Sequence, residues 1–345
     1  MIIIMQRLVT APEPVLNPDG TPNAGYCTVE TQIFKRSAIH ANPFRIKEWD
    51  FYQIEDTEGK LVLQLTFGHA SYMGEANIML FDVQQKRFIR NVTVLIPFPF
   101  GRLHMPESAA KQNVVEYHSK RADVLFTGDA MERQLTMRVD DVKTDLILKA
   151  ETDHSLIINI PFNENPHAFY YDFKQNCMSV EGRLEYMDGN AIRQVNYGKD
   201  RIEAYAILDW GRGVWPWHNE WYWSNGQGMV DGKLLGFNLG CGFGNTEQAT
   251  ENILFYENKP HKLDQMTIHH EADFMKPWTL TDNEGRCHLT MTPEYDRITK
   301  IKIAMIDNCT HQVFGKFNGE VTLDDGRILH VVDVPAFAEH AVNNW

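Results

Sequence analysis

The sequence lacks any apolar run that approaches the roughly 18 residues of a membrane-spanning helix. Its apolar start, Met1–Met5, is also too short for the central region of a signal peptide, and no small-residue cleavage site follows it. Secreted and membrane-inserted chains depend on segments of these two kinds. The sequence therefore predicts a cytoplasmic protein without a membrane span.

Cysteine is scarce, and the five that occur are widely scattered and form no CxxC pair. An odd number without close spacing argues against a disulfide framework and against a zinc site. No HExxH motif is present, and His269-His270 has no convincing third ligand in the sequence. A Gly-x-Ser-x-Gly elbow is absent as well, so a hydrolase triad has no support. We expect neither a bound metal nor another cofactor.

Basic residues are outnumbered, because 33 lysines and arginines face 46 acidic residues and give a net charge of −13. An acidic surface repels phosphate groups, so nucleic acid and anionic membranes are disfavoured as partners, although a local basic pocket is compatible with the composition. The 345 residues suffice for two domains, and 43% hydrophobic residues are ample for packed cores. We expect a hydrophobic small-molecule ligand, and the sequence leaves the oligomeric state open.

Short alternating apolar runs dominate the chain, as at residues 61–67 and 135–139. Alternation with a period of two places one set of side chains on one face of a strand. Asp-Gly or Glu-Gly pairs, which suit tight hairpin turns, recur between such runs. They begin at Asp19, Glu58, Asp188, Asp231, Glu284 and Asp325. Few segments have a helical period, with a short helix at 108–117 the main candidate. The sequence predicts an all-β, mainly antiparallel fold of barrel-like meanders.

An internal repeat accompanies this pattern. Glu48-Trp49-Asp50 precedes a Glu-Gly-Lys-Leu turn, and Glu220-Trp221-Tyr222 precedes an Asp-Gly-Lys-Leu turn, with the two tryptophans 172 positions apart (221 − 49). A second match pairs Gly182-Arg183-Leu184-Glu185 with Gly315-Lys316-Phe317-Asn318. The two matches, in the same order, favour duplication. We expect one β-barrel domain over residues 1–215, with an N-terminal segment that wraps across it, and a second over 216–345. Trp49 and Trp221 would then occupy equivalent positions.

The segment 209–223 holds five of the eight tryptophans together with Asp, Arg, His and Glu residues. Aromatic walls with a few polar groups are typical of small-molecule pockets, and Trp faces also stabilise positive charge. We predict Asp209 as a general acid, with a pKa raised by its aromatic surroundings, and His218 as a proton shuttle. The candidate substrate-binding residues are Trp210, Arg212, Trp215, Trp217, Glu220, Trp221 and, from the other half, Trp49.

A structural interpretation competes with this one. The tryptophans could close a barrel end, and Asp209 and Arg212 could form a structural ion pair. In the first half, we expect Glu48 and Asp50 to be solvent-exposed. The glycine-rich Gly240–Gly244 lacks the strand–helix context of a dinucleotide-binding loop, so we expect it to bend a strand or to let the backbone approach a ligand.

Four segments resemble the domain-of-unknown-function family 2804, and the resemblance spans nearly the whole chain. They are Lys47–Tyr52, Asp209–Gly213, Trp221–Trp223 and Val313–Gly319. That family has no established activity, so the resemblance implies an identity rather than a reaction.

The pattern is more distantly similar to the superfamily of carotenoid 1,2-hydratases, AttH-like proteins and certain Diels–Alderases. The resemblance implies two lipocalin-like barrels and, as in several members, cofactor-free, non-redox chemistry on hydrophobic substrates. Those proteins often carry an Asp-His-x-Trp-Gly-like motif before a Trp-rich strand. This sequence has Asp209-Trp210-Gly211 there, and the nearest histidine, His218, lies nine positions further on. The role of the hydratase proton donor is therefore not assigned to a residue of this sequence.

Three functions are compatible with these residues. The first is a cofactor-independent hydratase, isomerase or cyclase in which a carboxylic acid protonates a hydrophobic substrate and tryptophan faces stabilise the cation. The second is a non-catalytic carrier of a lipid or other hydrophobic ligand. The third is a carbohydrate-active protein, because Trp platforms with carboxylates also suit sugars. The fold alone does not choose among them.

Overall fold

The computed structural model describes residues 6–70, 72–303 and 306–344, so the apolar start Met1–Met5 lies outside the described residues. Strands dominate these residues, with two short 3₁₀ turns, η1 (Arg36–Ala38) and η2 (Pro43–Arg45), and no α-helix in the described part of the chain. No described helix has the length and apolarity that crossing a bilayer requires. The prediction of an all-β fold is confirmed.

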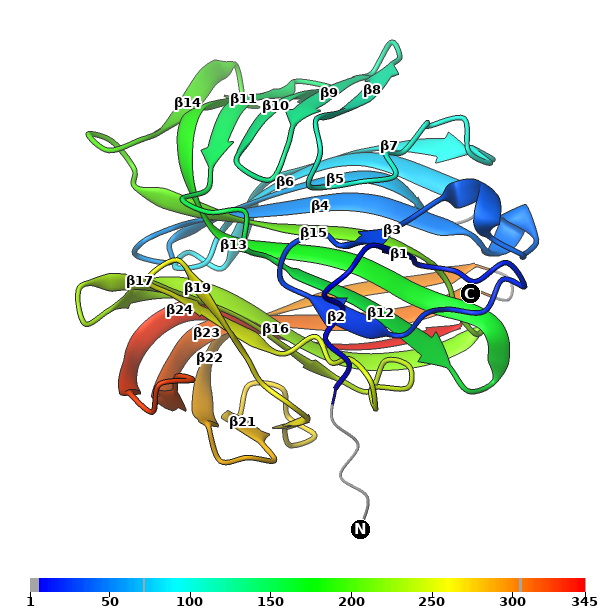
Figure 1. Ribbon diagram of the computed structural model, residues 1–345. Helices are drawn as coiled ribbons and strands as arrows, with labels where there is room; N and C mark the ends of the chain where they lie inside the picture. The colour runs from blue at the N-terminus through cyan, green and yellow to red at the C-terminus, as the bar shows by residue number, and fades with distance from the viewer. Residues whose placement is uncertain (1–5, 71, 304–305, 345) are drawn as a thin grey trace.

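Two large sheets and one small pair contain all the described strands (Figure 1). The first sheet contains β2 (Gly25–Cys27), β4 (Lys47–Asp56), β5 (Leu61–Ala70), β6 (Met73–Asp82), β7 (Arg87–Pro97), β8 (Asn113–His118), β9 (Ala122–Gly128), β10 (Glu132–Val139), β11 (Val142–Lys149), β12 (Leu156–Phe162), β13 (Asn165–Asp188), β14 (Ala191–Tyr197) and β15 (Ala204–Val214). The second contains β16 (His218–Val230), β17 (Lys233–Cys241), β18 (Ile253–Tyr256), β19 (Lys259–Lys262), β20 (Met266–His269), β21 (Trp278–Asp282), β22 (Cys287–Ile303), β23 (Ile306–Thr322) and β24 (Ile328–Asn344). The small pair is β1 (Glu13–Pro14) with β3 (Gln32–Ile33).

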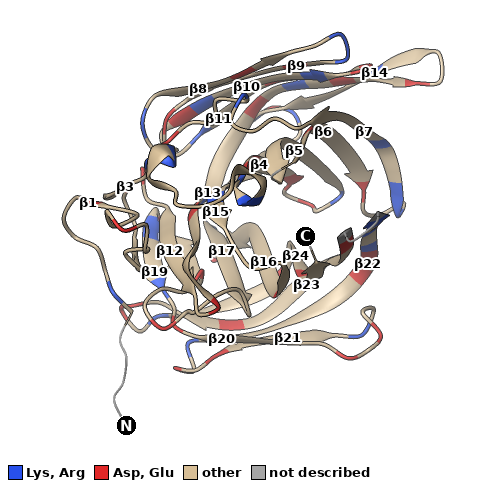
Figure 2. Ribbon diagram, turned by 90° about the vertical axis from the view of Figure 1, so that its right-hand side faces the viewer, with Lys and Arg blue, Asp and Glu red and all other residues tan. Residues whose placement is uncertain are grey.

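The strand order makes each sheet an open half-barrel. The first runs β7-β6-β5-β4-β15-β13-β11-β10-β9-β8, with β12 and β14 paired to the long β13 and β2 paired to β12. The second runs β19-β18-β17-β16-β24-β23-β22-β21-β20. Figure 2 shows both sheets curving strongly, each around its own interior. This architecture confirms the expected antiparallel, lipocalin-like class.

The two halves repeat the same order of strands. In the first half, the meander β4–β7 begins beside the last strand, β15, which pairs on its other side with β13. In the second half, the meander β16–β19 begins beside the last strand, β24, which pairs on its other side with β23. Trp49 lies on β4 and pairs with Gly211 of β15, whereas Trp221 lies on β16 and pairs with Ala341 of β24. The two tryptophans therefore occupy equivalent strands, and the internal repeat is confirmed.

The chain passes from the first sheet to the second between Val214 and His218. The division into folding domains at 215/216 stays a prediction. The N-terminal segment touches both halves: β2 pairs with β12, the Arg7 amide donates to the Gln248 carbonyl over 2.8 Å, and Gln6 bonds Asp264.

Alternation along the strands separates two apolar interiors from the layer between the sheets. On β15, Leu208 and Trp210 face the core of the first half, whereas Ile207 packs with Trp223 and Phe337 between the sheets. Asp209 lies on the same face as Ile207, because residues two apart share a face. The Asp209 side chain therefore lies in the layer between the two sheets.

Two expectations, and one part of the competing structural interpretation, are wrong. The segment expected as a helix holds β8, because Val115 alternates with exposed neighbours. Glu48 and Asp50 are buried, at 1% and 3% exposure, since on β4 they point into the first half-barrel. Asp209 and Arg212 do not pair: three positions apart on one strand, they lie on opposite faces.

The actual partners explain these burials. The Arg212 guanidinium donates to Asp50 over 3.0 Å and lies 3.7 Å from the ring centroid of Trp210. The Glu48 carboxylate lies within 3.0 Å of both Arg36 and His69. Each buried charge is thus compensated inside the first half-barrel.

Candidate functional site

A cluster of charged side chains is buried between the two sheets. Lys174 Nζ on β13 lies 2.7 Å from Asp172 Oδ2, 2.6 Å from Asp209 Oδ2 on β15, and 3.5 Å from Glu251 Oε2 on the loop between β17 and β18. All four residues, which we call the carboxylate cluster, are at most 7% exposed. Both halves of the chain therefore contribute to one charged site.

Three carboxyl groups share a single lysine in this cluster. Burial, reinforced by the charge of Asp209, raises the pKa of Asp172 to about 7, and burial also raises the pKa of Glu251. Although burial by itself lowers the pKa of Lys174, the charges of Asp172 and Asp209 raise it overall. The lysine therefore stays charged while a carboxyl group retains a proton near neutral pH. A buried proton donor of this kind is what general acid catalysis requires.

Aromatic side chains hold the carboxyl groups in place. Trp49 Nε1 donates to Asp209 Oδ1 over 2.8 Å, and the Tyr170 hydroxyl donates to Asp172. Lys174 Nζ lies 4.7 Å from the ring centroid of Trp223. The faces of these rings are suited to stabilising positive charge next to the acid groups.

The second half repeats the tryptophan–carboxylate pair. Trp221 Nε1 donates to Glu339 Oε1 over 2.8 Å, and Glu339 lies two residues before the strand partner of Trp221, as Asp209 does relative to Trp49. Burial raises the pKa of Glu339 to about 7, and the charge of Asp209 adds to that effect. The duplicated pairs are thus electrostatically coupled across the junction.

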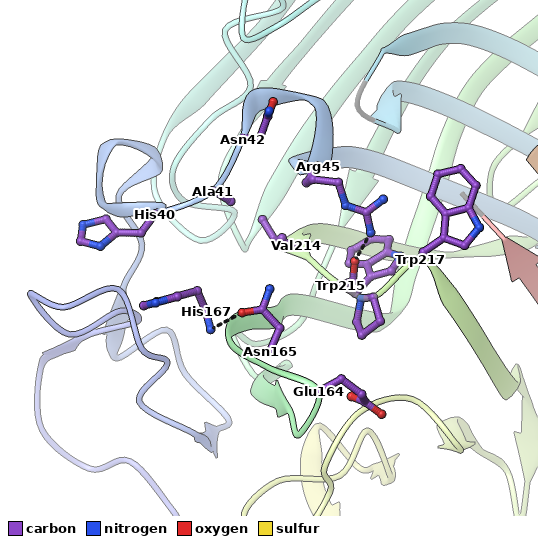
Figure 3. Close-up of a pocket in the computed structure, with 11 residues that line it drawn as sticks. His40, Ala41, Asn42, Arg45, Glu164, Asn165, His167, Val214, Trp215 and Trp217 are labelled. Atoms are coloured by element: carbon purple, nitrogen blue, oxygen red, sulfur yellow. Dashed lines mark hydrogen bonds between the residues drawn. The ribbon is translucent and has the colours of Figure 1, made fainter. Parts of the chain in front are cut away.

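A cavity of about 400 Å³ opens next to this site (Figure 3). It is lined by Arg45, Trp215 and Trp217 together with polar residues that include His40, Glu164 and His167. Arg45 donates to the Trp215 carbonyl over 2.6 Å and lies 5.8 Å from the Trp217 ring. The cavity thus combines aromatic walls with a cation.

Trp215 connects the cavity to the carboxylate cluster. Its ring packs edge-on against Trp49 at 5.5 Å and Tyr170 at 6.2 Å, the two rings that bond Asp209 and Asp172. Its buried indole N–H has no hydrogen-bond partner within the described ranges. Trp215 belongs to the short linker between β15 and β16.

The glycine-rich segment supports the same aromatic group. Phe243 lies 5.5 Å from Trp215 and 5.4 Å from Trp221, and its flanking Gly242 and Gly244 have φ angles of +90° and +75°. A Cβ atom at Gly240 would lie 2.3 Å from Glu251 Oε1. The glycines therefore give Phe243 its position and leave space for a cluster carboxyl group.

The structure brings some of the predicted site residues together and separates others. Asp209 and Trp49 belong to the carboxylate cluster and its aromatic wall, Trp221 bonds Glu339, and Trp215 and Trp217 line the adjacent cavity. Trp210 and Arg212 face the opposite side, inside the first half-barrel.

The remaining two candidates lie near the ends of the paired strands. His218 is exposed and its Nδ1 lies 3.0 Å from Asn344, so its role as a proton shuttle stays a prediction. Glu220 lies 2.8 Å from His340 Nε2 and is half exposed.

Sequence reasoning missed Asp172, Lys174, Glu251 and Glu339. A signal existed for the first two, because the charged side chains at 172 and 174 alternate with aromatic ones at 171 and 173. Charged groups on one face of a strand that is apolar on the other indicate a buried polar partner. No comparable local signal marks Glu251 or Glu339.

The fold and this junction site define a class: proteins built of two lipocalin-like halves. The chain belongs to the family described as Domain of unknown function (DUF2804), whose model matches residues 6–345. No protein with a curated description matches the chain.

Solved structures show the same fold at low sequence identity. The structure of CghA with Sch210972 matches with a TM-score of 0.55 and 9% identity, over 98% of this chain and 96% of that chain. An AttH-like protein from Nitrosomonas europaea matches with a TM-score of 0.49 and 14% identity, over 88% and 94%. Kievitone hydratase from Nectria haematococca matches with a TM-score of 0.49 and 9% identity, over 87% and 89%.

Proposed function

We propose that this protein is a cofactor-independent hydratase, isomerase or cyclase that acts on a hydrophobic small molecule by general acid catalysis. The observation that carries the proposal is the carboxylate cluster, in which buried Asp172, Asp209 and Glu251 share one lysine. Asp172 and Asp209 are the acid groups, because each also bonds an aromatic side chain at the wall facing Trp215. Protonation of an alkene or related group would create a cation that the neighbouring indole faces stabilise.

The substrate would bind in the cavity at Trp215 and Trp217, with the Trp215 N–H as a donor to a substrate oxygen. Reaction requires the Trp215 ring to move, because this ring separates the cavity from Trp49 and Tyr170. The shared fold of CghA, whose structure contains Sch210972, supports the idea that this architecture accommodates a small molecule. A cytoplasmic location is part of the proposal, supported by the five cysteines, all of which are free.

A carrier of a hydrophobic ligand is the second candidate function. The cavity lining favours a carrier because it contains no member of the carboxylate cluster; its acidic residue is Glu164. A carrier would hold its ligand against Trp215 and Trp217 without the ring movement that catalysis requires. The two functions make opposite predictions for the acid groups.

The test begins with mass spectrometry of small molecules extracted from natively purified protein, which supplies the ligand. Asp172→Asn and Asp209→Asn are then assayed with it, and Asp50→Asn, a buried ion-paired aspartate on the opposite face, is the matched control. Catalysis predicts loss of turnover by a factor of roughly 100 or more in the first two variants with ligand binding retained. Two results would favour the carrier. One is unchanged conversion in the Asp172 and Asp209 variants. The other is a wild type that does not convert the ligand and whose ligand affinity depends on Trp215 and Trp217.

A further inference from the structure

Three histidines come together inside the second half-barrel. His340 lies on β24 two positions after the core residue Ala338, so its side chain faces the same interior. His311 lies opposite it on β23, and His270 begins the loop that joins β20 to β21. In Figure 2, β20 and β21 lie across the interior of the second half from β16 and β24. The Glu339 carboxyl group faces the junction from the opposite side of β24, so the histidines are separate from the proposed acid groups.

Hydrogen bonds join two of these rings to a carboxylate. His270 Nδ1 lies 2.6 Å from the Glu271 carbonyl oxygen, and His270 Nε2 lies 3.1 Å from His340 Nδ1. His340 Nε2 in turn lies 2.8 Å from Glu220 Oε1. We call Glu220, His340 and His270 the histidine chain. Tyr222 stacks on His340 with the ring centroids 4.3 Å apart, which holds the His340 ring between its two partners.

The acceptors at the two ends of the histidine chain determine where its protons lie. A carbonyl oxygen and a carboxylate only accept hydrogen bonds, so His270 Nδ1 and His340 Nε2 must each carry a hydrogen. The contact between the two rings needs a third hydrogen, whereas two neutral imidazoles carry one N–H each. The complete chain therefore contains one extra proton, and its positive charge is compensated by the Glu220 carboxylate.

The extra proton belongs on His340. Burial lowers the pKa of His270, and the charge of His340 lowers it further. A neutral His270 keeps its hydrogen on Nδ1, for the Glu271 carbonyl, and accepts at Nε2 from His340. A charged His340 donates from both nitrogens, to His270 and to Glu220. The chain is thus complete with His340 charged and His270 neutral.

The histidine chain ends in a loop that covers aromatic side chains. The Phe274 ring stacks on His311 at 3.8 Å, and the His270 ring stacks on Trp278 at 4.2 Å. Trp278 is 0% exposed, and its Nε1 donates to the Phe274 carbonyl over 3.0 Å. The hydrogen bond between His270 and His340 joins this loop, residues 270–277, to β24.

We propose that residues 270–277 form a lid over the end of the second half-barrel and that acidification opens it. When His270 also takes up a proton, N–H groups face each other between the two rings and two positive charges meet there, so the hydrogen bond is lost. The pKa of His270 is lower in the closed lid than the ordinary value of about 6.5, which we expect in the open lid. The closed lid is therefore stable above this pH and loses stability as the pH falls below it.

The other titratable groups around the lid do not oppose this response. His311 lies 2.8 Å from Asp296, which compensates its charge. Burial raises the pKa of Tyr222 and of Cys241, so both stay neutral below pH 8. The remaining titratable side chains on or beside the lid are exposed to solvent, where charges are screened: His269, Glu271, Asp273 and Lys276. The contact between His270 and His340 is therefore the acid-sensitive point of the lid.

The experiment is hydroxyl-radical footprinting of the full chain between about pH 7.5 and about pH 5.5, read by mass spectrometry. One extra proton changes the ratio of open to closed lids by up to tenfold per pH unit, so the oxidation of Trp278 should increase roughly tenfold over this range. Trp210, which is 1% exposed inside the first half-barrel, is the internal control and should not change.

Two variants separate the lid from other effects of pH. His270→Phe keeps a ring on Trp278 and removes the titrating group, so Trp278 oxidation should become independent of pH. His269→Gln, in the exposed neighbour, is the matched control and should respond like the wild type.

Nitrogen NMR of the imidazole rings tests the proton count. At about pH 7, the His340 ring should be doubly protonated in the wild type and neutral in Glu220→Gln. The glutamine side chain can donate to His340 Nε2, which completes the chain without an extra proton.

Thermal melting shows whether each variant is folded, and His270→Gln replaces His270→Phe if that one is not. Constant oxidation of Trp278 in the wild type would refute the lid, as would an equal rise at Trp210, which means that the whole chain opens. An unchanged pH response in the folded His270 variant would overturn it as well. A neutral His340 ring in the wild type would contradict the proton count on which the proposal depends.

Discussion

Lys174→Met tests whether the carboxylate cluster is as charged and as buried as the structure shows. The substitution keeps the length and the apolar stem of the side chain and removes the cation from three buried carboxyl groups. At an effective dielectric constant of about 20, one contact at 2.6 Å corresponds to about 6 kcal/mol of attraction. Most of this is offset by the cost of burying the lysine, and removing one partner of a buried pair costs about 3–5 kcal/mol net. If the 345 residues unfold together, the melting temperature should fall by roughly 4–7 °C.

The pH dependence of the variant is the sharper readout. Without the lysine, the cluster carboxyl groups must take up protons, so their pKa values in the folded state rise above those in the unfolded chain. Their contribution to stability is then fully present at low pH and is lost as the pH rises, by about 1.4 kcal/mol per pH unit for each extra proton bound. Melting followed by circular dichroism between about pH 5 and pH 8 should show the variant deficit growing with pH. Lys149→Met, an exposed strand lysine near Glu181, is the control. A Lys174→Met variant that melts like the wild type at every pH would refute the buried cluster.

Three further predictions concern other parts of the junction and the first half-barrel. Burial, reinforced by the charge of Asp56, raises the pKa of Glu55 to about 8. The contribution of Glu55 to stability is therefore present at low pH and lost as the pH rises through 8. The melting temperature of Glu55→Gln, measured relative to the wild type, should be higher at about pH 9 than at about pH 5. Gly240→Ala places a Cβ against the Glu251 carboxyl group and should lower the free energy of unfolding in denaturant by about 1–3 kcal/mol. Gly232→Ala is the control, because nothing lies within 4 Å of the added Cβ and only the strain of its φ of +74° remains. Equal losses of stability at the two positions would contradict the crowding at Gly240. Arg212→Met leaves Asp50 uncompensated inside the first half-barrel and should lower stability by about 3–5 kcal/mol. Arg121→Gln, in the exposed pair with Asp140, should leave the melting temperature nearly unchanged. A larger loss of stability in Arg121→Gln than in Arg212→Met would be inconsistent with the burial of Asp50.

The fold could be predicted from local patterns because alternation and tight-turn residues act over a few positions. The repeat was detectable because Trp49 and Trp221 lie 10 and 11 residues before the turn glycines Gly59 and Gly232, and the structure places them on equivalent strands. Asp209 was identifiable from its tryptophan-rich neighbourhood. Its partner was not, because Lys174 lies 35 positions away on β13 and only the pairing of β13 with β15 brings the two together.

Other features of the site depend on which face of a strand points where. The expected Asp209–Arg212 pair would need two residues three apart on a strand to share a face, which alternation forbids. Glu48 and Asp50 resemble surface residues in the sequence. Their burial depends on Arg36, in the turn before β4, and on Arg212, on the distant strand β15. Glu251 reaches the cluster from a loop whose path no periodicity reveals.

The pairing of β4 with β15 and of β16 with β24 also sets the order of events during synthesis. Glu48 pairs with Arg212 and His218 with Asn344, so each half joins its first meander strand to a strand more than 100 residues later. While the ribosome is still translating, the inner edge of β4 stays unpaired until β15 emerges, and an unpaired edge is a template for aggregation. Contacts of such long sequence separation also slow folding. The architecture that buries the acid groups between two halves therefore makes the nascent chain dependent on protection until its last strand, β24, is released.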